Sequence, residues 1–245
     1  MTGAAKGIGK EITQRLLSLG HKVIGFDIDE KALETMVSDL AYTDKFLSYK
    51  VDVTSESEIK NSVKLAHDSF GPITILVNNA GGSMSLSKTI ETITTPEWDL
   101  VIEYNLKSTF LVTKAVVPFM KEAKWGRIVN FASIAGRGRS YFGATPYASA
   151  KAGIIGFTRQ GSRELGPYGI TMNAVAPGVV NSGERISQYW QNKTEEEKQA
   201  LLNLIPVGRL GTNQEIAAIA AFLCSDESSY ITGAVIDVNG GFWVG

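Results

Sequence analysis

Met1 is followed by Thr2-Gly3-Ala4-Ala5-Lys6-Gly7-Ile8-Gly9, a glycine-rich stretch that leads directly into residues 10–19. There, apolar side chains recur at the three- and four-residue spacing of an amphipathic helix, which predicts a glycine turn opening a helix. Without side chains at positions 3, 7 and 9, the main chain can turn tightly and approach a pyrophosphate, whose charge the amides of a helix N-terminus favour. The Gly-x-x-x-Gly-x-Gly spacing differs from the common dinucleotide fingerprint, so an ordinary loop is the competing interpretation.

A short apolar segment, residues 21–27, comes next and ends in Asp27, eighteen residues beyond Gly9. In dinucleotide-binding folds an acid at about 20 residues past the glycines binds the adenosine ribose hydroxyls and disfavours a 2′-phosphate. The position of Asp27 therefore favours NAD(H) as the cofactor. Lys6 within the turn points the other way, because a cation there could meet a 2′-phosphate, so NADP(H) stays open as the alternative.

Polar residues further along the chain can carry proton chemistry. Tyr147 and Lys151 lie four residues apart in a stretch, 145–165, that reads as a helix, so they share one face. A neighbouring ammonium favours the phenolate and would lower the phenol pKa from its ordinary value near ~10. Ser133 ends the apolar run 127–132, a predicted buried parallel strand, and would emerge where ligands bind in open α/β sheets. Taken alone, each of these features is also common on protein surfaces.

Strand and helix patterns alternate along the whole chain with no linker, low-complexity tract or repeat. This predicts an α/β fold: one doubly wound parallel sheet in a Rossmann-like three-layer arrangement, forming a single domain over residues 1–245. The expected strands are residues 21–27, 46–52, 73–78, 126–132, 169–175 and 233–238. The expected helices are residues 8–19, 29–40, 55–70, 97–123, 145–165 and 213–225.

Composition narrows the function classes. The formal net charge of −1 over 245 residues, without a basic cluster, argues against nucleic acid as a partner. No apolar segment approaches the roughly 20 residues that span a membrane, and the N-terminus lacks a signal-peptide pattern, so we expect a cytoplasmic protein. Cys224, the single cysteine, lies in an apolar run and is expected to be buried. His21 and His67 are too isolated to predict a metal site.

The chain resembles the short-chain dehydrogenase/reductase family in its single-domain form. The resemblance runs from Thr2 to the C-terminus, and several independent motifs appear in the order expected for that family. They are Thr2 to Gly9, Val51-Asp52-Val53, Asn78-Asn79-Ala80-Gly81, Asn105, Ser133, Tyr147-Ala148-Ser149-Ala150-Lys151, Pro177-Gly178 and Val238-Asn239-Gly240-Gly241.

The resemblance implies roles for individual residues. Tyr147 would be the general acid/base, Lys151 would lower its pKa and hold the nicotinamide ribose, and Ser133 would orient the substrate oxygen. Asn105 would support a water-linked proton path, whereas Asn78 would be a structural bridge between strands. Asp52 would meet the adenine, with Val53 beside it. The expected cofactor-binding residues are Gly3, Lys6, Gly7, Ile8, Gly9, Asp27, Asp52, Val53, Asn79, Ala80, Gly81, Tyr147, Lys151, Pro177, Gly178, Val180 and Ser182.

One departure from the family concerns the first strand. The family places a buried apolar strand immediately before the Thr-Gly turn, and we expect that strand to be missing here, because the sequence begins at Met1. In a doubly wound sheet this strand is central, so its absence would leave two unpaired strand edges in the interior. Each unsatisfied buried amide or carbonyl costs roughly 1–3 kcal/mol. We therefore expect either a late start, with Met1 standing where the strand's last residue should be, or flanking strands that close up, or a neighbouring chain that fills the gap.

Residues 183–206 interrupt the strand and helix rhythm and resemble the mobile substrate lid of the family. Within this segment, Tyr189 and Trp190 could cover a substrate or equally pack against another subunit. Four residues between Ser133 and Tyr147 border the expected pocket, and the two arginines among them could receive a carboxylate or phosphate. These residues are Arg137, Arg139, Tyr141 and Phe142.

Three functions are compatible with the sequence. The leading one is an NAD(P)(H)-dependent oxidoreductase that interconverts a secondary alcohol and a ketone with the Asn105, Ser133, Tyr147 and Lys151 tetrad. The second, suggested by residues 204–211, is a 3-oxoacyl-[acyl-carrier-protein] reductase, against which Asp27 counts because that activity commonly uses NADPH. The third is a non-catalytic nucleotide-sensing scaffold, which the complete tetrad disfavours.

The partners expected are a small-molecule alcohol or ketone and further copies of the chain. Relatives are usually homotetramers built from the helices at 97–123 and 145–165 and from C-terminal contacts. The aromatic tail, with Phe242 and Trp243, fits a subunit interface, and an intramolecular fold-back of the tail is the competing interpretation.

Overall fold

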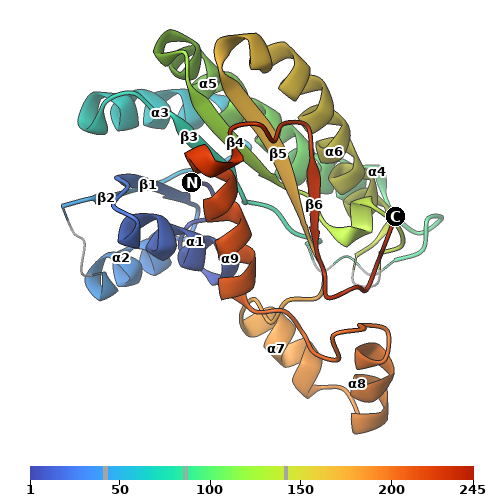
Figure 1. Cartoon of the computed structure of the whole chain (residues 1–245). Coiled ribbons are helices and arrows are strands. Elements are labelled where there is room, and N and C mark those ends of the chain that lie inside the picture. Colours follow the sequence, from blue (N-terminus) through green and yellow to red (C-terminus); the bar gives the residue numbers. More distant parts are fainter. Residues whose placement is uncertain (41–43, 85, 87, 141–142) are drawn as a thin grey trace.

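The computed structural model describes residues 1–40, 44–84, 86, 88–140 and 143–245. It contains parallel strands flanked by helices, as Figure 1 shows, which confirms the predicted α/β class. The strands are β1 (Val23–Asp27), β2 (Phe46–Lys50), β3 (Ile75–Asn78), β4 (Gly126–Phe131), β5 (Ile170–Pro177) and β6 (Val235–Val238). Each predicted strand is present and begins or ends within two residues of its expected bounds.

The α-helices are α1 (Gly7–Ser18), α2 (Glu30–Asp39), α3 (Glu56–Phe70), α4 (Thr95–Ile102), α5 (Ser108–Ala123), α6 (Thr145–Leu165), α7 (Glu184–Gln191), α8 (Glu195–Leu202) and α9 (Asn213–Leu223). Short 3₁₀ turns cover Ile134–Gly136, Gly166–Tyr168 and Asp226–Ser228. Several starts follow from side chains that cap the first amides: Asp29 accepts from the Ala32 N–H, and Thr212 forms a capping box with Glu215. Among the described residues, no helix is both long enough and apolar enough to cross a membrane.

The helix predicted over 97–123 is present as one continuous helical segment, but it contains a π-turn that the prediction did not include. A π-helical turn, Glu103–Lys107, separates α4 from α5, and it contains Asn105. Apolar periodicity could not reveal this, because one widened turn leaves the spacing on either side nearly unchanged. Such π-turns are common at functional sites, since they redirect a single side chain within an otherwise regular helix.

The sheet separates two hydrophobic layers. Because neighbouring residues of a strand point to opposite faces, Leu76 and Ile128 pack with α3 and α5, while Val77 and Val129 pack with α1 and α9. β1 pairs with β2, and β3, β4, β5 and β6 pair in that order.

Cys224 is buried in the hydrophobic layer that contains α1 and α9, as predicted, and burial raises the pKa of its thiol to about 12.

Residues 1–4 occupy the position between β1 and β3. Thr2 forms parallel bridges to Phe26 on one side and to Asn78 on the other. The Met1 carbonyl accepts a hydrogen bond from the Phe26 N–H at 2.8 Å, and the Thr2 N–H donates to the Val77 carbonyl at 3.0 Å. Met1 therefore lies where the family resemblance led us to expect the last residue of the central strand. The flanking strands do not close up, because a residue bridged to both holds them two strand spacings apart, about 9.6 Å.

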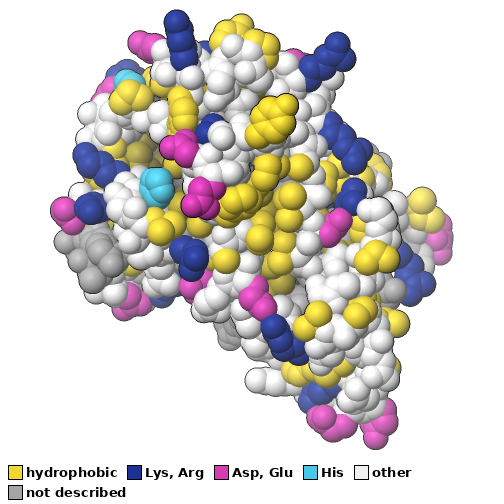
Figure 2. All heavy atoms as spheres, in the orientation of Figure 1, with side chains coloured by type: hydrophobic (Ala, Val, Ile, Leu, Met, Phe, Trp, Pro, Cys, Tyr) yellow, Lys and Arg dark blue, Asp and Glu magenta, His cyan; other side chains and the backbone are white. Residues whose placement is uncertain are grey.

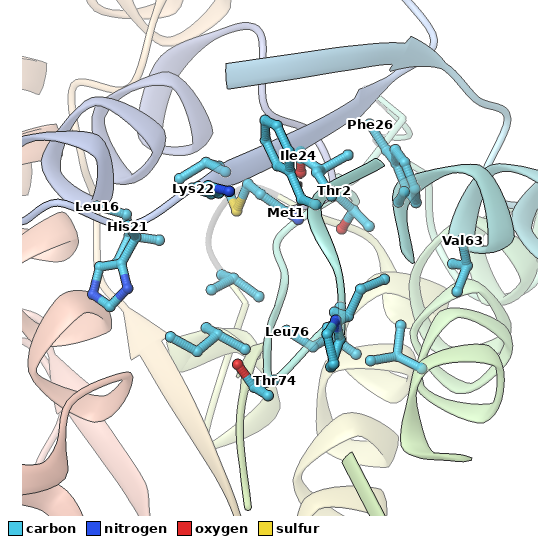
Figure 3. A pocket seen from close by; sticks show the side chains of 18 of the residues that line it. Met1, Thr2, Leu16, His21, Lys22, Ile24, Phe26, Val63, Thr74 and Leu76 are labelled. Carbon is cyan, nitrogen blue, oxygen red and sulfur yellow. Dashed lines mark hydrogen bonds between the residues drawn. The ribbon is translucent and has the colours of Figure 1, made fainter. Parts of the chain in front are cut away.

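A cavity of about 320 Å³ continues from Met1 between β1 and β3. Figure 3 shows apolar side chains such as Ile24, Leu76 and Val63 around this space, with Met1 and Thr2 at its end. The α-amino group of Met1 donates to the Ile24 carbonyl at 2.9 Å, and burial lowers its pKa to about 6. The predicted interior gap is thus real in this structure, and it is separate from the site described next.

Candidate functional site

A second cavity, of about 300 Å³, lies at the carboxyl ends of the strands, and we call it the site cleft. The structure brings thirteen of the predicted site residues into its walls. They are Lys6, Gly7, Ile8, Gly9, Asn79, Gly81, Ser133, Tyr147, Lys151, Pro177, Gly178, Val180 and Ser182. Segments far apart in the sequence thus converge where parallel α/β sheets bind their ligands.

The glycine turn forms one wall of the site cleft and packs too tightly for side chains. A Cβ on Gly9 would lie 1.8 Å from the Gly3 carbonyl oxygen, and a Cβ on Gly7 would lie 2.2 Å from the Ser182 carbonyl oxygen. Gly7 also has a φ of 53°, which glycine adopts at little cost. Asn79 braces the turn by donating from Nδ2 to the carbonyls of Thr2 and Gly3. Main chain at the start of α1 therefore faces the cleft bare, which fits a pyrophosphate.

Two carboxylates lie beside this turn: Asp27 is the last residue of β1, and Asp29 follows it. Asp27 accepts hydrogen bonds from the Ala5 N–H and from the Asp29 N–H, both at 3.0 Å. Asp29 in turn accepts from the Lys6 ammonium at 2.6 Å, and this contact lowers the pKa of the Asp29 carboxyl. From the sequence, Lys6 was a possible binding partner for a 2′-phosphate. In the structure its charge is balanced by the Asp29 carboxylate.

Tyr147 and Lys151 lie on the face of α6 that borders the site cleft. The Lys151 Nζ is 5.6 Å from the centroid of the Tyr147 ring and donates to the Phe131 carbonyl at 2.8 Å. Only 4 % of Lys151 is exposed, and burial lowers the pKa of its ammonium to about 8. Tyr147 and Lys151 thus share one helix face, as predicted. The Lys151 ammonium beside the phenol loses its proton more easily than an exposed lysine does.

This burial predicts a stability that depends on pH. The Lys151 pKa is about 8 in the folded chain and 10.5 for an unperturbed lysine, so the unfolded chain holds more protons between these values. The free energy of unfolding should therefore rise with pH across that window, by roughly 3 kcal/mol in all. Denaturant unfolding at about pH 8 and about pH 10 tests this, with Lys151→Met as a reference that cannot titrate. Equal pH slopes for the two proteins would contradict it.

Ser133 and Asn105 flank this pair. Ser133 follows the end of β4 and its Oγ accepts from the Ala135 N–H at 3.1 Å. Asn105 is fully buried behind the cleft wall, where its Oδ1 accepts from the Gly82 N–H at 3.0 Å and its Nδ2 donates to the Gly82 carbonyl at 2.9 Å. A Cβ on Gly81 would lie 2.7 Å from that Oδ1. The π-turn therefore aims Asn105 at the strip of main chain next to Lys151.

Some predicted residues stand outside the cleft walls. Gly3 and Ala80 lie beneath the glycine turn, with Ala80 donating its N–H to the Thr2 hydroxyl. Asp52 accepts from the Thr54 N–H and hydroxyl. Val53 is 5 % exposed and its side chain packs in the core, so only its main chain is available to a nucleotide. Asn78 bridges to Asn130 of β4 through its Nδ2 at 2.9 Å, which confirms the structural role expected of it.

The structure also corrects and extends the expected pocket. Arg137 is not among the residues that line the site cleft, and its guanidinium pairs with Asp237 at 3.0 and 3.2 Å. Tyr141 and Phe142 lie outside the described residues. Ser140 and Ile186 also line the cleft. Ile186 lies on α7, within the segment 183–206 that was expected to form the lid, but neither residue was singled out from the sequence.

Comparison with known proteins gives the same picture. A family model described as "Enoyl-(Acyl carrier protein) reductase" matches residues 3–243. The chain belongs to the short-chain dehydrogenase/reductase family. It is therefore an oxidoreductase, of a family that uses nicotinamide dinucleotides.

Individual relatives of this short-chain dehydrogenase/reductase support the assignment over nearly the full length. The chain is 40 % identical to the (2S)-[(R)-hydroxy(phenyl)methyl]succinyl-CoA dehydrogenase subunit BbsD of Thauera aromatica, covering 98 % of this chain and 94 % of that one. It is 37 % identical to the 3-oxoacyl-[acyl-carrier-protein] reductase FabG of Escherichia coli, covering 100 % and 96 %. The crystal structure of levodione reductase superimposes with a TM-score of 0.91 at 32 % identity, covering 98 % of this chain and 95 % of that one.

Proposed function

We propose that the chain is an NAD(H)-dependent oxidoreductase that interconverts a secondary alcohol and a ketone. The observation that carries this proposal is the convergence of Ser133, Tyr147 and Lys151 in the same cleft as the bare glycine turn. A carbonyl carbon held in this cleft would have proton donors and space for a nicotinamide beside it. Residues 1–245 are proposed to form one domain.

The proposed roles follow from position. Tyr147 moves the proton: its phenol donates to the substrate oxygen during reduction, and its phenolate accepts the hydroxyl proton during oxidation. Lys151, 5.6 Å from the ring centroid, favours the phenolate through its charge and lies where it can hold the nicotinamide ribose. Ser133 donates a hydrogen bond to the substrate oxygen and orients it. The bound dinucleotide supplies or accepts the hydride.

Asn105 is proposed as a support for proton supply to Lys151. Its side chain already holds both polar main-chain atoms of Gly82, so it fixes the cleft wall beside the lysine. The Val101 carbonyl accepts a further hydrogen bond from its Nδ2 at 2.8 Å, across the start of the π-turn. The Val101 carbonyl, beside the widened turn, is a suitable anchor for an ordered water that could relay a proton to Lys151.

A preference for NAD(H) is supported by the charges at the end of β1. Asp27 is held by two main-chain N–H groups, and Asp29 neutralises the Lys6 ammonium at 2.6 Å. A 2′-phosphate placed there would meet two carboxylates and one already paired cation, which is unfavourable. The hydroxyls of an unmodified ribose would instead find an oriented acceptor.

Titration of the protein with NADH and then with NADPH, followed by nicotinamide fluorescence, tests the proposal before any substrate is known. Tighter binding of NADH supports the assignment. Tighter binding of NADPH would overturn the proposed preference and favour the acyl-carrier reductase function. If neither binds, the proposed dinucleotide-dependent activity fails for this chain, because its site would not hold the hydride carrier.

Replacing Asp27→Asn should shift the preference toward NADPH. The asparagine keeps the size of the side chain but removes the charge, so the ratio of the NADPH and NADH dissociation constants should fall by about tenfold or more. Asp68→Asn is the matched control, because that carboxylate pairs with Lys64 on α3, outside the site cleft. An unchanged ratio in Asp27→Asn would show that this carboxylate does not select the cofactor.

A second candidate narrows the substrate to acyl thioesters. Two of the relatives named above act, by their names, on an acyl-CoA and on an acyl-carrier-protein substrate. We propose that 3-hydroxyacyl and 3-oxoacyl thioesters belong in the first substrate panel, beside simple alcohols and cyclic ketones. A kcat/KM for an acyl-CoA at least about 100-fold above that for the matching free alcohol or ketone would favour this candidate.

Residues 183–206 are proposed as the lid of the site cleft. Figure 1 shows α7 and α8 projecting away from the sheet, and Ile186 of α7 lines the cleft. At the base of this segment Val180 bridges to Gly211, so its two ends are held together. Such an anchored excursion can move over a bound substrate without disturbing the sheet.

A homotetramer is proposed as the assembly. Figure 2 shows hydrophobic side chains gathered between α9 and β6, and Phe222 and Tyr230 are exposed in this region. α5 likewise exposes Phe110. Contiguous apolar surface of this kind is typical of subunit contacts. Sedimentation that finds a monomer at micromolar protein would reject the proposal.

A further inference from the structure

Residues 239–245, which we call the tail, contact three segments, two of which contribute walls of the site cleft. The first is the loop that follows Ser133, the second is the end of β5 at Gly178, and the third is the end of the proposed lid at residues 205–207. The pairing of β4 with β5 fixes the strand ends beneath the first two segments as far as Phe131 and Val175, but the loop that follows Ser133 extends beyond this pairing. The tail is therefore placed to set their relative positions.

Arg137 attaches the tail to the Ser133 loop. Its guanidinium forms two hydrogen bonds with the Asp237 carboxylate, at 3.0 and 3.2 Å, and a third with the Gly245 main-chain oxygen at 3.1 Å. The Trp243 ring lies against the same guanidinium, 4.4 Å from ring centroid to Cζ. A Cβ on Gly138 would lie 2.6 Å from the Trp243 Nε1. This side of the loop is therefore in close contact with the indole.

The other two segments, Gly178 and the end of the proposed lid, contact the beginning of the tail. A Cβ on Gly178 would lie 2.7 Å from the Asn239 Cα, and the Gly178 N–H donates to the Val238 carbonyl at 2.9 Å. A Cβ on Gly241 would lie 2.9 Å from Pro206, and the Val207 N–H donates to the Gly240 carbonyl at 3.1 Å. Asn239 stiffens the tail between these contacts by donating from Nδ2 to the Trp243 carbonyl at 2.9 Å.

We infer that Arg137 and Trp243 are positioning residues that hold the Ser133 loop in register with Gly178 and the lid. The inference rests on the proposed function of the site cleft. Arg137 is 16 % exposed and Asp237 25 %, so water screens their contact only partly and the pair is more rigid than a surface ion pair. Movement of the loop by a fraction of an ångström would misplace the Ser133 hydroxyl against the substrate oxygen.

The chain contains a near copy of this cluster in a place without chemistry. Trp125 lies 4.4 Å from the Arg127 guanidinium, and Arg127 pairs with Asp226 at 3.2 Å. This second cluster sits at the opposite end of β4 from Ser133 and does not line the site cleft. Trp125→Ala therefore removes the same kind of contact as Trp243→Ala, and the difference between the two variants isolates the effect on the site.

The test compares Trp243→Ala, Trp243→Phe and Trp125→Ala by hydrogen exchange and by kinetics. Four amides of the Ser133 loop, those of Ala135, Gly136, Arg137 and Gly138, are hydrogen-bonded within the loop. In Trp243→Ala these amides should exchange at least about tenfold faster, while Trp125→Ala leaves them unchanged. kcat/KM should fall by about tenfold or more in Trp243→Ala, with the NADH dissociation constant unchanged, and Trp243→Phe should restore most of it.

Two outcomes would overturn the inference. One is loop exchange in Trp243→Ala that matches Trp125→Ala, and the other is faster loop exchange with unchanged kcat/KM. The exchange measurement needs no substrate, so it separates this inference from the proposed function. Faster loop exchange in Trp243→Ala, in a protein that binds neither dinucleotide, would support the role of the tail and overturn the proposed function instead.

Discussion

Replacing Tyr147→Phe should reduce turnover by roughly 1,000-fold while leaving the NADH dissociation constant within about twofold of its original value. The substitution removes only the hydroxyl that moves the proton. The ring stays in place beside Lys151, whose Nζ keeps its hydrogen bond to the Phe131 carbonyl. Single-turnover measurements with the best alcohol or ketone found by screening would show whether the chemical step carries the loss.

Tyr168→Phe is the matched control for this prediction. The Lys121 Nζ lies 4.1 Å from the Tyr168 ring centroid, so this tyrosine also has a lysine neighbour, but it lies outside the site cleft. Its turnover should be unchanged. If Tyr147→Phe kept full turnover, another group would move the proton, and if it lost NADH binding as well, the hydroxyl would have a role in holding the cofactor.

Most of the fold could be predicted from local patterns. Strands rich in apolar residues, such as 126–132, are buried on both faces of a parallel sheet, so their pattern could be recognised in the sequence. The central position between β1 and β3 was harder to predict, since Met1 to Ala4 lie there and two bridges made by one residue leave no periodicity to detect. The π-turn at Asn105 was missed for a related reason, because its cause is tertiary: the asparagine bonds to Gly82 and Val101 together.

The site was predictable where one residue type is required by the chemistry. The glycines of the turn, Tyr147 and Lys151 were of this kind, and the structure brings them to one cleft. Residues that act through contacts distant in the chain gave no signal. Arg137 looked like an anion receptor, yet its partner Asp237 is 100 residues away, and nothing in either local sequence indicates the pairing. The same holds for Lys6, whose charge is balanced by Asp29 across the turn.

The glycine turn allows the sharpest test of the cofactor site, through Gly9→Ala. A Cβ at this position would lie 1.8 Å from the Gly3 oxygen and 2.8 Å from the Asn79 Nδ2, so the turn must open. Overpacking of this kind typically costs about 1–3 kcal/mol of stability. The displaced main chain also no longer presents its amides to the pyrophosphate, so NADH affinity should fall on the order of 100-fold.

Gly156→Ala on α6 supplies the reference, because a Cβ there meets nothing within 4 Å. In the middle of a helix, alanine should stabilise the chain by up to about 1 kcal/mol and leave NADH binding unchanged. Denaturant unfolding and NADH fluorescence on both variants separate two effects that a single mutant would mix. If Gly9→Ala lost stability but kept its NADH affinity, the glycine would be needed only to pack α1 against Gly3, and the pyrophosphate would have to lie elsewhere. If Gly9→Ala lost more NADH affinity than its loss of stability can explain, the pyrophosphate would lie directly against this turn.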